Sequence, residues 1–310
     1  MKAVRIHAFG GPETMIYADA PLPEPAAGEV RIRVRAAGLN PVDWKIREGY
    51  LRQRLPHQMP LVLGWDVAGD IDALGPGVAQ FAVGDAVYAM TDIGRDGAYA
   101  EYVVVAVALV APMPASLPYE AAASVPLVAQ TAWQALYETA PVQPGQQVLV
   151  HGAAGGVGTF AVQLAQLRGA VVLATASGKD AEYVRQLGAS QVIDYRTQAF
   201  EEVLSDVDLV LDTVGGAVQE RSWRVLRPGG TLLSAVQPPS PEAAAQAHAT
   251  GLMIHVQPTA GRLRQLNSLF DGGQLTTHVG QVYPLDAAKH ALELLQDGQA
   301  GRGKLVLHVA

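Results

Sequence analysis

The feature that most constrains the fold is a series of short apolar segments after residue 146, with helix-like segments between them. A strand can dispense with polar residues on one face only when both of its faces are buried, as in a parallel sheet covered by helices. Six segments fit this pattern: 147–151, 171–175, 191–194, 208–212, 231–236 and 252–257. The sequence therefore predicts an α/β domain built on a doubly wound, parallel, six-stranded sheet.

A glycine-rich turn joins the first of these strands to the first helical segment. Gly152, Gly155, Gly156 and Gly158 lie between the apolar strand and a helix expected to begin near Val157. Because glycine has no Cβ, the backbone can approach a pyrophosphate closely, and the positive N-terminus of the helix attracts its charge. Since the turn follows the first strand of a six-strand series, it indicates a dinucleotide-binding Rossmann domain rather than only a tight structural turn.

The chain outside this region has a different pattern. Residues 1 to about 115 contain short strand-like runs punctuated by Gly and Pro, which is typical of a mostly antiparallel β domain. Two amphipathic segments and a last strand follow the parallel sheet, at 262–270, 285–295 and 304–309. Because that sheet already has six strands, we expect the last strand to return to the β domain. The predicted domains are therefore 1–120 together with 260–310, and 121–259.

The composition excludes several functional classes. The 310 residues carry 22 Lys and Arg against 29 Asp and Glu, a net charge of −7, so no basic excess is available to neutralise nucleic-acid or membrane phosphates. With no cysteine, the chain has no disulfide and no zinc site that needs a thiolate. No run approaches the ~18 apolar residues of a membrane helix, and the first residues lack an apolar signal-peptide core. We therefore expect a cytoplasmic protein.

The end of the second predicted strand bears on the choice of cofactor. An acidic residue there would accept from both ribose hydroxyls of NAD and repel the 2′-phosphate of NADP. The sequence instead has Ser177 and Lys179, a hydrogen-bond donor and a positive charge suited to a 2′-phosphate, followed by Asp180. We therefore expect NADPH. The alternative is that Ser177 only caps the next helix and that Lys179 is solvated.

Motifs spread over the chain resemble those of one protein family. They lie at 37–49, 64–69, 84–88, 97–102 and 301–306, in addition to the glycine-rich turn. With these motifs the chain resembles, over essentially its whole length, the zinc-independent quinone oxidoreductases, which form the zeta-crystallin-like branch of the medium-chain dehydrogenase/reductase superfamily. The resemblance implies a GroES-like β-barrel catalytic domain and a Rossmann domain, with the active site in the cleft between them.

Two positions distinguish this chain from the zinc-dependent members of that superfamily. Those enzymes have a Cys ligand where this chain has Asn40, and a Gly-His-Glu sequence where it has Gly64, Trp65 and Asp66. Without a Lewis acid, an enzyme loses its means of stabilising an alkoxide during alcohol oxidation. The resemblance therefore implies hydride transfer from NADPH to an acceptor that is already electron-poor, such as a quinone or an enone.

The resemblance also implies that Asn40 and Asp43 are catalytic, and the sequence adds Tyr50 as a candidate that could line the acceptor pocket, with a packing role as its alternative. The amide of Asn40 would donate to the acceptor or orient it, and the hydroxyl of Tyr50 can also donate. The residues leave open an alternative in which Asn40 and Asp43 bond only local backbone in an Asn-Pro turn. A tyrosine that many relatives carry in this motif is replaced here by Lys45, so the sequence assigns no proton donor.

A larger set of residues is implied to bind the cofactor. The set comprises Asn40, Thr131, Gly155, Gly156, Val157, Ser177, Lys179, Tyr195, Val214, Ala235, Val236 and Lys304. Two of them have a simpler alternative, because Thr131 can be a helix-interior residue and Lys304 can be solvated. His151, in the first strand of the parallel sheet, is expected to be a buried, hydrogen-bonded residue of the core rather than a catalyst.

The sequence thus favours an NADPH-dependent reductase of quinones or related conjugated carbonyls. An enone or alkenal double-bond reductase is a neighbouring alternative, since the same donors would stabilise an enolate. A non-catalytic NADPH-binding redox sensor is an alternative of another class, because a fold does not guarantee chemistry. The sixth strand would leave an unpaired sheet edge, so a homodimer is also expected.

Overall fold

The structure of the protein is a computed structural model that describes residues 1–309. The chain divides into two compact units, one formed by Met1–Leu127 with Pro258–Ala310 and the other by Val128–Gln257. The first border lies at 127 rather than at the expected 120, because α2 (Tyr119–Ala123) packs on the sheet of the first unit. The second border lies at 257 rather than at 259.

The second unit contains a six-stranded, all-parallel sheet with the strand order β11-β10-β9-β12-β13-β14. Its strands in chain order are β9 (Gln147–Val150), β10 (Val171–Ala176), β11 (Gln191–Asp194), β12 (Val207–Asp212), β13 (Leu226–Ser234) and β14 (Thr250–Met253). The chain moves outward from β9 in one direction and then restarts beside β9 at β12. This reversal is the topological switch point of a doubly wound fold, so the predicted Rossmann architecture is confirmed.

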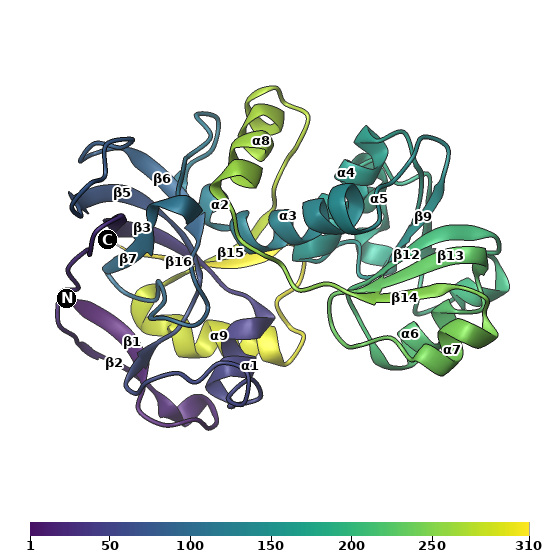
Figure 1. Cartoon of the computed structure of the whole chain (residues 1–310). Helices are drawn as coiled ribbons and strands as arrows, with labels where there is room; N and C mark the ends of the chain where they lie inside the picture. Colours follow the sequence, from purple (N-terminus) through teal and green to yellow (C-terminus); the bar gives the residue numbers. More distant parts are fainter. Residues whose placement is uncertain (310) are drawn as a thin grey trace. The chain divides into compact units, whose positions relative to one another are not determined.

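Helices cover both faces of the parallel sheet. Figure 1 shows α4 (Gly156–Leu167) and α5 (Ala181–Gln186) on one side of it, and α6 (Gly216–Ser222) and α7 (Pro241–Gln246) on the other. This distribution follows from right-handed crossovers that start from β9 and proceed in opposite directions. The carboxyl ends of the strands, and the loops that leave them, consequently gather at one edge.

The sixth strand differs in its bounds from the predicted segment 252–257. It covers Thr250–Met253, where Thr250 pairs with Thr231 and Met253 with Ser234. The chain then leaves the sheet, because the side chain of Gln134 bonds the backbone of the following residues. Its Nε2 donates to the His255 carbonyl at 3.1 Å, and its Oε1 accepts from the Gln257 N–H at 2.9 Å.

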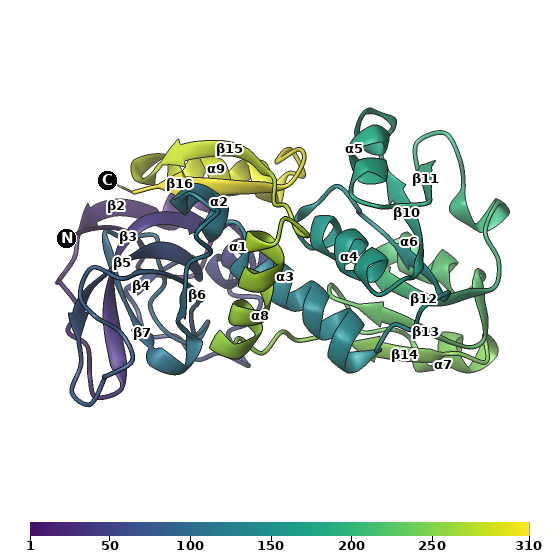
Figure 2. The same cartoon turned by 90° about the horizontal axis from the view of Figure 1, so that it is seen from above.

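The first unit contains a mostly antiparallel seven-stranded sheet. Its strands are β15 (Val279–Pro284), β16 (Lys304–His308), β3 (Glu29–Gly38), β5 (Asp66–Leu74), β6 (Ala86–Met90) and β8 (Ala111–Pro112) in spatial order, with β7 (Tyr102–Ala106) also paired to β3. The last strand does return to this domain, because β16 pairs antiparallel with β3 and parallel with β15. Figure 2 shows β15, β16 and α9 (Ala288–Gln296) lying together, in yellow.

Shorter elements complete the first unit. A three-stranded sheet has the order β2 (Met15–Asp19), β1 (Lys2–Ile6), β4 (Leu61–Val62), and the remaining helices are α1 (Pro41–Arg47) and α8 (Ala260–Asp271). Ion pairs fasten β3 to β5, with Arg31 Nε 2.6 Å from Asp72 Oδ2 and Arg35 Nε 2.7 Å from Asp70 Oδ2.

Buried apolar residues pack together within each unit. Ile32, Trp65 and Tyr99 belong to the core of the first unit, and Leu149 and Val210 to that of the second. Among residues 1–309, no helix is long and apolar enough to cross a membrane.

Candidate active site

The glycine-rich turn after β9 has a geometry that only glycine allows. Gly152 has φ +65°, and a Cβ on Gly158 would lie 2.3 Å from the Gly152 carbonyl oxygen. Gly155 is the N-cap of α4 and offers no side-chain cap to the first turn of the helix. The first backbone N–H groups of α4 have no partner within the helix itself, so the turn forms a bare cradle for an anion.

The other residues predicted to bind a cofactor in the second unit follow the ends of neighbouring strands. Ser177 follows β10, Tyr195 follows β11, and Ala235 and Val236 follow β13. Because carboxyl ends of parallel strands meet at one sheet edge, the fold brings these residues to the edge where α4 begins. Thr131 is different, since it lies buried within α3 (Pro126–Trp133).

Ser177 is the N-cap residue of a 3₁₀ turn at Gly178–Asp180, but its side chain makes no capping hydrogen bond. Its Oγ donates to Asp180 Oδ2 at 2.6 Å, and both side chains are buried. Lys179 lies between them and is exposed. Tyr195 is 58% exposed, with the Arg196 guanidinium 5.8 Å from its ring centroid. An exposed cation and an exposed aromatic ring thus follow two adjacent strands.

The buried carboxylate of Asp212 fixes the loop after β12. One of its oxygens accepts from the backbone N–H of Val214 at 2.9 Å and of Gly215 at 2.8 Å. The other accepts from Gln219 Nε2 at 3.0 Å and from Ser234 Oγ at 2.9 Å. These four bonds hold the turn in which Val214, 49% exposed, presents its side chain.

His151 at the end of β9 is fully buried, as expected from the sequence. Its ring nitrogens bond Thr175 Oγ1 and Ser222 Oγ, both at 3.0 Å, and its ring packs on Phe200. Burial lowers the pKa of His151 to about 4, against a smaller opposing effect of Asp212. The residue is therefore neutral near pH 7 and joins two hydroxyl groups within the core.

This environment predicts a loss of stability in acid. Because the pKa of His151 is about 4 in the fold and 6.5 when unfolded, the unfolded chain binds the proton more readily as pH falls below 6.5. We expect the free energy of unfolding to fall by about 2 kcal/mol between pH 7 and pH 5 from this residue alone. Chemical denaturation of wild type and His151→Gln should show it, since glutamine keeps a donor and an acceptor but does not titrate.

The comparison with the variant is needed because Asp43, discussed below, acts in the opposite direction. Burial raises the pKa of its carboxyl to about 7, so its contribution to stability falls as pH rises from 3.8 towards 7. The difference between wild type and His151→Gln cancels this effect. Parallel pH profiles for the two proteins would contradict the prediction.

In the first unit, Asn40 and Asp43 shape the start of α1. Asn40 is the N-cap, Pro41 follows at the first helical position, and the Asp43 Oδ2 accepts from the Asn40 N–H at 2.8 Å. Proline suits this position because the N–H that it lacks has no helical partner. The local bond of Asp43 agrees with the turn expected as an alternative, but the side chain of Asn40 also bonds residues far away in the sequence.

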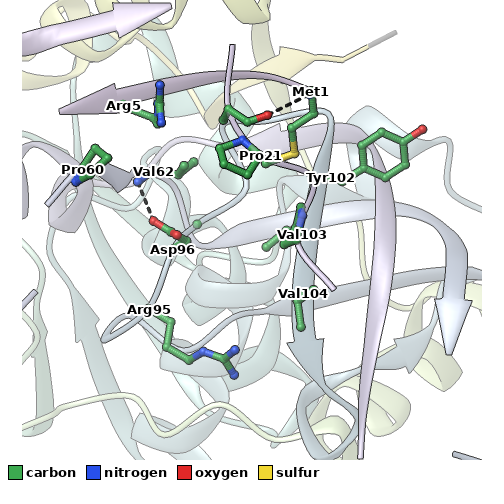
Figure 3. Close-up of a pocket in the computed structure, with 13 residues that line it drawn as sticks. Met1, Arg5, Pro21, Pro60, Val62, Arg95, Asp96, Tyr102, Val103 and Val104 are labelled. Carbon is green, nitrogen blue, oxygen red and sulfur yellow. Dashed lines mark hydrogen bonds between the residues drawn. The ribbon is translucent and has the colours of Figure 1, made fainter. Parts of the chain in front are cut away.

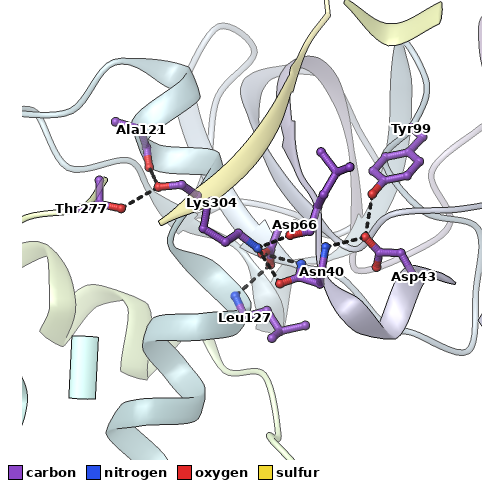
Figure 4. Close-up of polar contacts among 10 residues, drawn as sticks. Asn40, Asp43, Asp66, Tyr99, Ala121, Leu127, Thr277 and Lys304 are labelled. Atoms are coloured by element: carbon purple, nitrogen blue, oxygen red, sulfur yellow. Dashed lines mark hydrogen bonds and ion pairs between the residues drawn. The ribbon is translucent and has the colours of Figure 1, made fainter. Parts of the chain in front are cut away.

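The Asn40 amide instead lies between two charged side chains distant in sequence (Figure 4). Its Nδ2 donates to Asp66 Oδ2 at 2.9 Å, and its Oδ1 accepts from Lys304 Nζ at 2.5 Å. All three residues are buried, with Lys304 the most exposed at 6%. Burial raises the pKa of Asp66 and lowers that of Lys304, while their mutual attraction opposes both shifts.

The register of β16 explains how Lys304 reaches this point. Val306 pairs with Gly38 and the Leu39 N–H donates to the Leu305 carbonyl, so the strand begins beside Asn40. Gly303, just before it, has φ +72°, and a Cβ there would lie 2.1 Å from the His278 carbonyl oxygen. The glycine therefore allows the chain to enter β16 in this register.

Tyr99 completes the polar cluster on the other side. Its hydroxyl donates to Asp43 Oδ2 at 2.6 Å, and the pKa of Tyr99 is raised well above 10 by burial. Gly64, at φ +82°, makes room for the ring, because a Cβ there would lie 2.1 Å from it. The other Asp43 oxygen, Oδ1, is buried without a hydrogen-bond partner.

Tyr50 does not belong to this cluster. It follows α1, is 68% exposed, and packs edge-on against Trp44 with ring centroids 5.9 Å apart. Lys45 Nζ lies 5.7 Å from the centroid of the Trp44 ring. Tyr50, Trp44 and Lys45 therefore form a separate surface group on and after α1.

A cavity of about 380 Å³ in the first unit is a separate feature (Figure 3). Its walls are mainly apolar, with Arg5, Arg95 and Asp96 among the lining residues. None of the residues predicted for the catalytic or cofactor site lines it.

Sequence reasoning missed two members of the buried cluster. In the sequence, Asp66 stands out only as a position where a zinc ligand is absent, and Tyr99 only as part of a family motif. An acidic residue within the apolar run 61–69 was the available signal for Asp66, because a buried carboxylate needs a partner. No local signal identified Lys304 as that partner, 238 residues away.

Comparison with known proteins identifies the family. Residues 26–115 match the family described as "Alcohol dehydrogenase GroES-like domain", and residues 187–307 match "Zinc-binding dehydrogenase". The human quinone oxidoreductase is 31% identical over 326 residues, which cover 99% of this chain and 97% of the human protein. The chain belongs to the quinone oxidoreductase branch of the medium-chain dehydrogenase/reductase superfamily. The family and the enzyme class expected from the sequence are thus confirmed.

Solved structures of quinone oxidoreductases agree with this assignment. The enzyme from Coxiella burnetii is 34% identical with a TM-score of 0.94, and the alignment covers 100% of this chain and 99% of that one. The Escherichia coli enzyme complexed with NADPH is 30% identical with a TM-score of 0.90, covering 99% of this chain and 100% of that one.

The donor set at Asn40 does not fit the zinc that one family description names. A zinc ion at this position would lie beside the ammonium of Lys304, which is 2.5 Å from Asn40 Oδ1 and would repel a dication. Among residues 1–309, no group of three or more His, Asp or Glu side chains is arranged to hold a metal ion. The residues around Asn40 therefore do not fit a zinc ion.

Proposed function

We propose that this chain is an NADPH-dependent reductase of quinones or related conjugated carbonyls. The observation that carries the proposal is the bare glycine-rich turn at the start of α4, whose geometry fits a pyrophosphate. The NADPH complex of the Escherichia coli relative supports the same cofactor for this chain. NADPH would supply a hydride when bound.

The residues of the chain would bind the cofactor, orient the acceptor and stabilise the negative charge that develops on the acceptor oxygen. The backbone N–H groups of Gly156 and Val157 would hold the diphosphate, and the predicted cofactor residues of the second unit would contact the rest of the dinucleotide. The amide of Asn40 would donate to the acceptor oxygen as negative charge develops there. Asn40 has no exposed surface, so an acceptor reaches it only after the groups that cover it have moved. In this proposal the proton comes from solvent.

A panel of acceptors tests the proposal. NADPH oxidation followed by absorbance should be fastest with quinones such as 1,4-naphthoquinone and slower with short alkenals. Faster turnover of alkenals would favour the double-bond reductase. Tight NADPH binding without turnover of any acceptor would favour the redox sensor.

The preference for NADPH over NADH rests on Lys179, which is exposed beside the end of β10. We expect Lys179→Met to weaken NADPH binding by about tenfold, because one charge-assisted contact to the 2′-phosphate is lost, and to leave NADH binding unchanged. Isothermal titration of both cofactors into both proteins measures this. Equal losses for NADH and NADPH would mean that Lys179 does not contact the 2′-phosphate.

A further proposal concerns the assembly of the protein. Within residues 1–309, β14 ends the parallel sheet and pairs only with β13, so we propose a homodimer formed by pairing of β14 with its copy. Light scattering that gives the mass of one chain would contradict the homodimer.

Residence in the cytoplasm stays a prediction from the sequence.

A further inference from the structure

The hydrogen bonds of Asn40 with Asp66 and Lys304 fix the orientation of its side-chain amide. Lysine only donates hydrogen bonds and a carboxylate only accepts them, so Lys304 must face the amide oxygen and Asp66 must face the NH₂ group. A rotation of the amide by 180° would place donor against donor and acceptor against acceptor. The two charged residues therefore allow one orientation of the Asn40 amide.

The contacts also determine which amide hydrogen is used. Lys304 Nζ bonds Asn40 Oδ1 at 2.5 Å and Asp66 Oδ2 at 3.4 Å, and Asn40 Nδ2 closes the ring to the same Asp66 oxygen at 2.9 Å. The hydrogen in this ring must be the one on the same side of the amide as Oδ1. The second Nδ2 hydrogen, on the opposite side, points away from both charged groups.

Neither charged residue has hydrogen-bonding capacity left to serve as the donor itself. The third N–H of Lys304 donates to the Leu39 carbonyl at 2.6 Å, so its three hydrogens are all used. The other oxygen of Asp66 accepts from the Leu127 N–H at 2.8 Å. Asp66 and Lys304 are therefore held by backbone on one side and hold Asn40 on the other.

We propose that Asp66 and Lys304 are positioning residues that fix the Asn40 amide so that its second N–H is directed at the oxygen of the acceptor. This inference rests on the proposed function. It separates a donor, Asn40, from two residues that act only through it. A buried donor that cannot rotate needs no reorganisation when charge develops on the acceptor, which is the property that makes such donors effective.

A double-mutant cycle tests the proposal. Lys304→Met should lower kcat/KM for 1,4-naphthoquinone by about 10- to 100-fold in the wild-type background, and by less than about twofold in the Asn40→Ala background. The Kd of NADPH should change little in either case. The same fold-change in both backgrounds would overturn the proposal, because it would show that Lys304 does not act through Asn40.

A second readout distinguishes positioning from a merely structural role. With a weaker donor at the acceptor oxygen, the rate should depend more steeply on the electron affinity of the acceptor. We expect Lys304→Met to steepen the plot of log kcat/KM against reduction potential for substituted naphthoquinones. An unchanged slope would contradict the proposal.

Two additional variants keep the test decisive. If Lys304→Met does not fold, the neutral pair Asp66→Asn with Lys304→Met replaces it, since removal of both buried charges is often tolerated. The matched control is Arg31→Met with Asp72→Asn, which removes an ion pair between β3 and β5. This control should change kcat/KM by the same factor in the wild-type and the Asn40→Ala backgrounds.

If wild type reduces no acceptor with NADPH, the proposed function itself fails. If wild type is active and the cycle is additive, only this inference fails.

Discussion

Replacement of Asn40 by alanine is expected to lower kcat for quinone reduction by about 100- to 1,000-fold, the effect of removing one donor from a developing oxyanion. NADPH affinity should stay within about threefold of wild type, because the bare turn and strand-end loops that would hold the dinucleotide belong to the other unit. Steady-state kinetics with 1,4-naphthoquinone and a cofactor titration measure the two quantities separately.

A control must show that the loss does not come from damage to the fold. Asn40→Ala leaves Asp66 and Lys304 without their shared amide partner, so some destabilisation is expected. Thr91→Val is a suitable control, because Thr91 is buried in the same unit and its Oγ1 has no hydrogen-bond partner. Comparable kinetics for Asn40→Ala and wild type, at temperatures where both are folded, would remove Asn40 from the mechanism.

The parallel sheet could be predicted because each strand carries its own local signal. The segment 191–194 coincides with β11, and the turn at Gly152 to Gly158 marks the start of α4 from its glycines alone. The end of β14 could not be predicted in this way. It depends on Gln134, whose side chain bonds the backbone at His255 and Gln257, and a contact over more than 120 residues leaves no periodic pattern in the sequence.

In the candidate site, too, short-range contacts could be predicted from the sequence and long-range contacts could not. The N-cap role of Asn40 and the local bond of Asp43 could be read from the spacing of Asn, Pro and Asp, because capping is a short-range effect. The bonds of the Asn40 side chain to Asp66 and Lys304 could not, because three strands or loops must first be placed side by side. The sequence thus indicated Asn40 as a candidate, and the structure shows what holds it.

Replacement of Val157 by aspartate is expected to weaken NADPH binding by more than about 100-fold. Val157 is half-buried in the first turn of α4, where the bare cradle fits a diphosphate. A carboxylate about 5 Å from that diphosphate would cost about 3 kcal/mol at an effective dielectric constant of 20. The same carboxylate is favourable for the helix, since an acidic residue near a helix N-terminus stabilises it by about 0.3–1 kcal/mol.

The substitution is informative because its effects on NADPH binding and on helix stability have opposite signs. NADPH affinity should fall while the melting temperature stays the same or rises. Val157→Asn is the matched control, with nearly the same size and no charge, and should retain most of the affinity. High salt should restore part of the binding to Val157→Asp, since screening weakens the repulsion. If Val157→Asp bound NADPH like wild type, the diphosphate would not lie at the start of α4, and the reading of the glycine-rich turn would have to be abandoned.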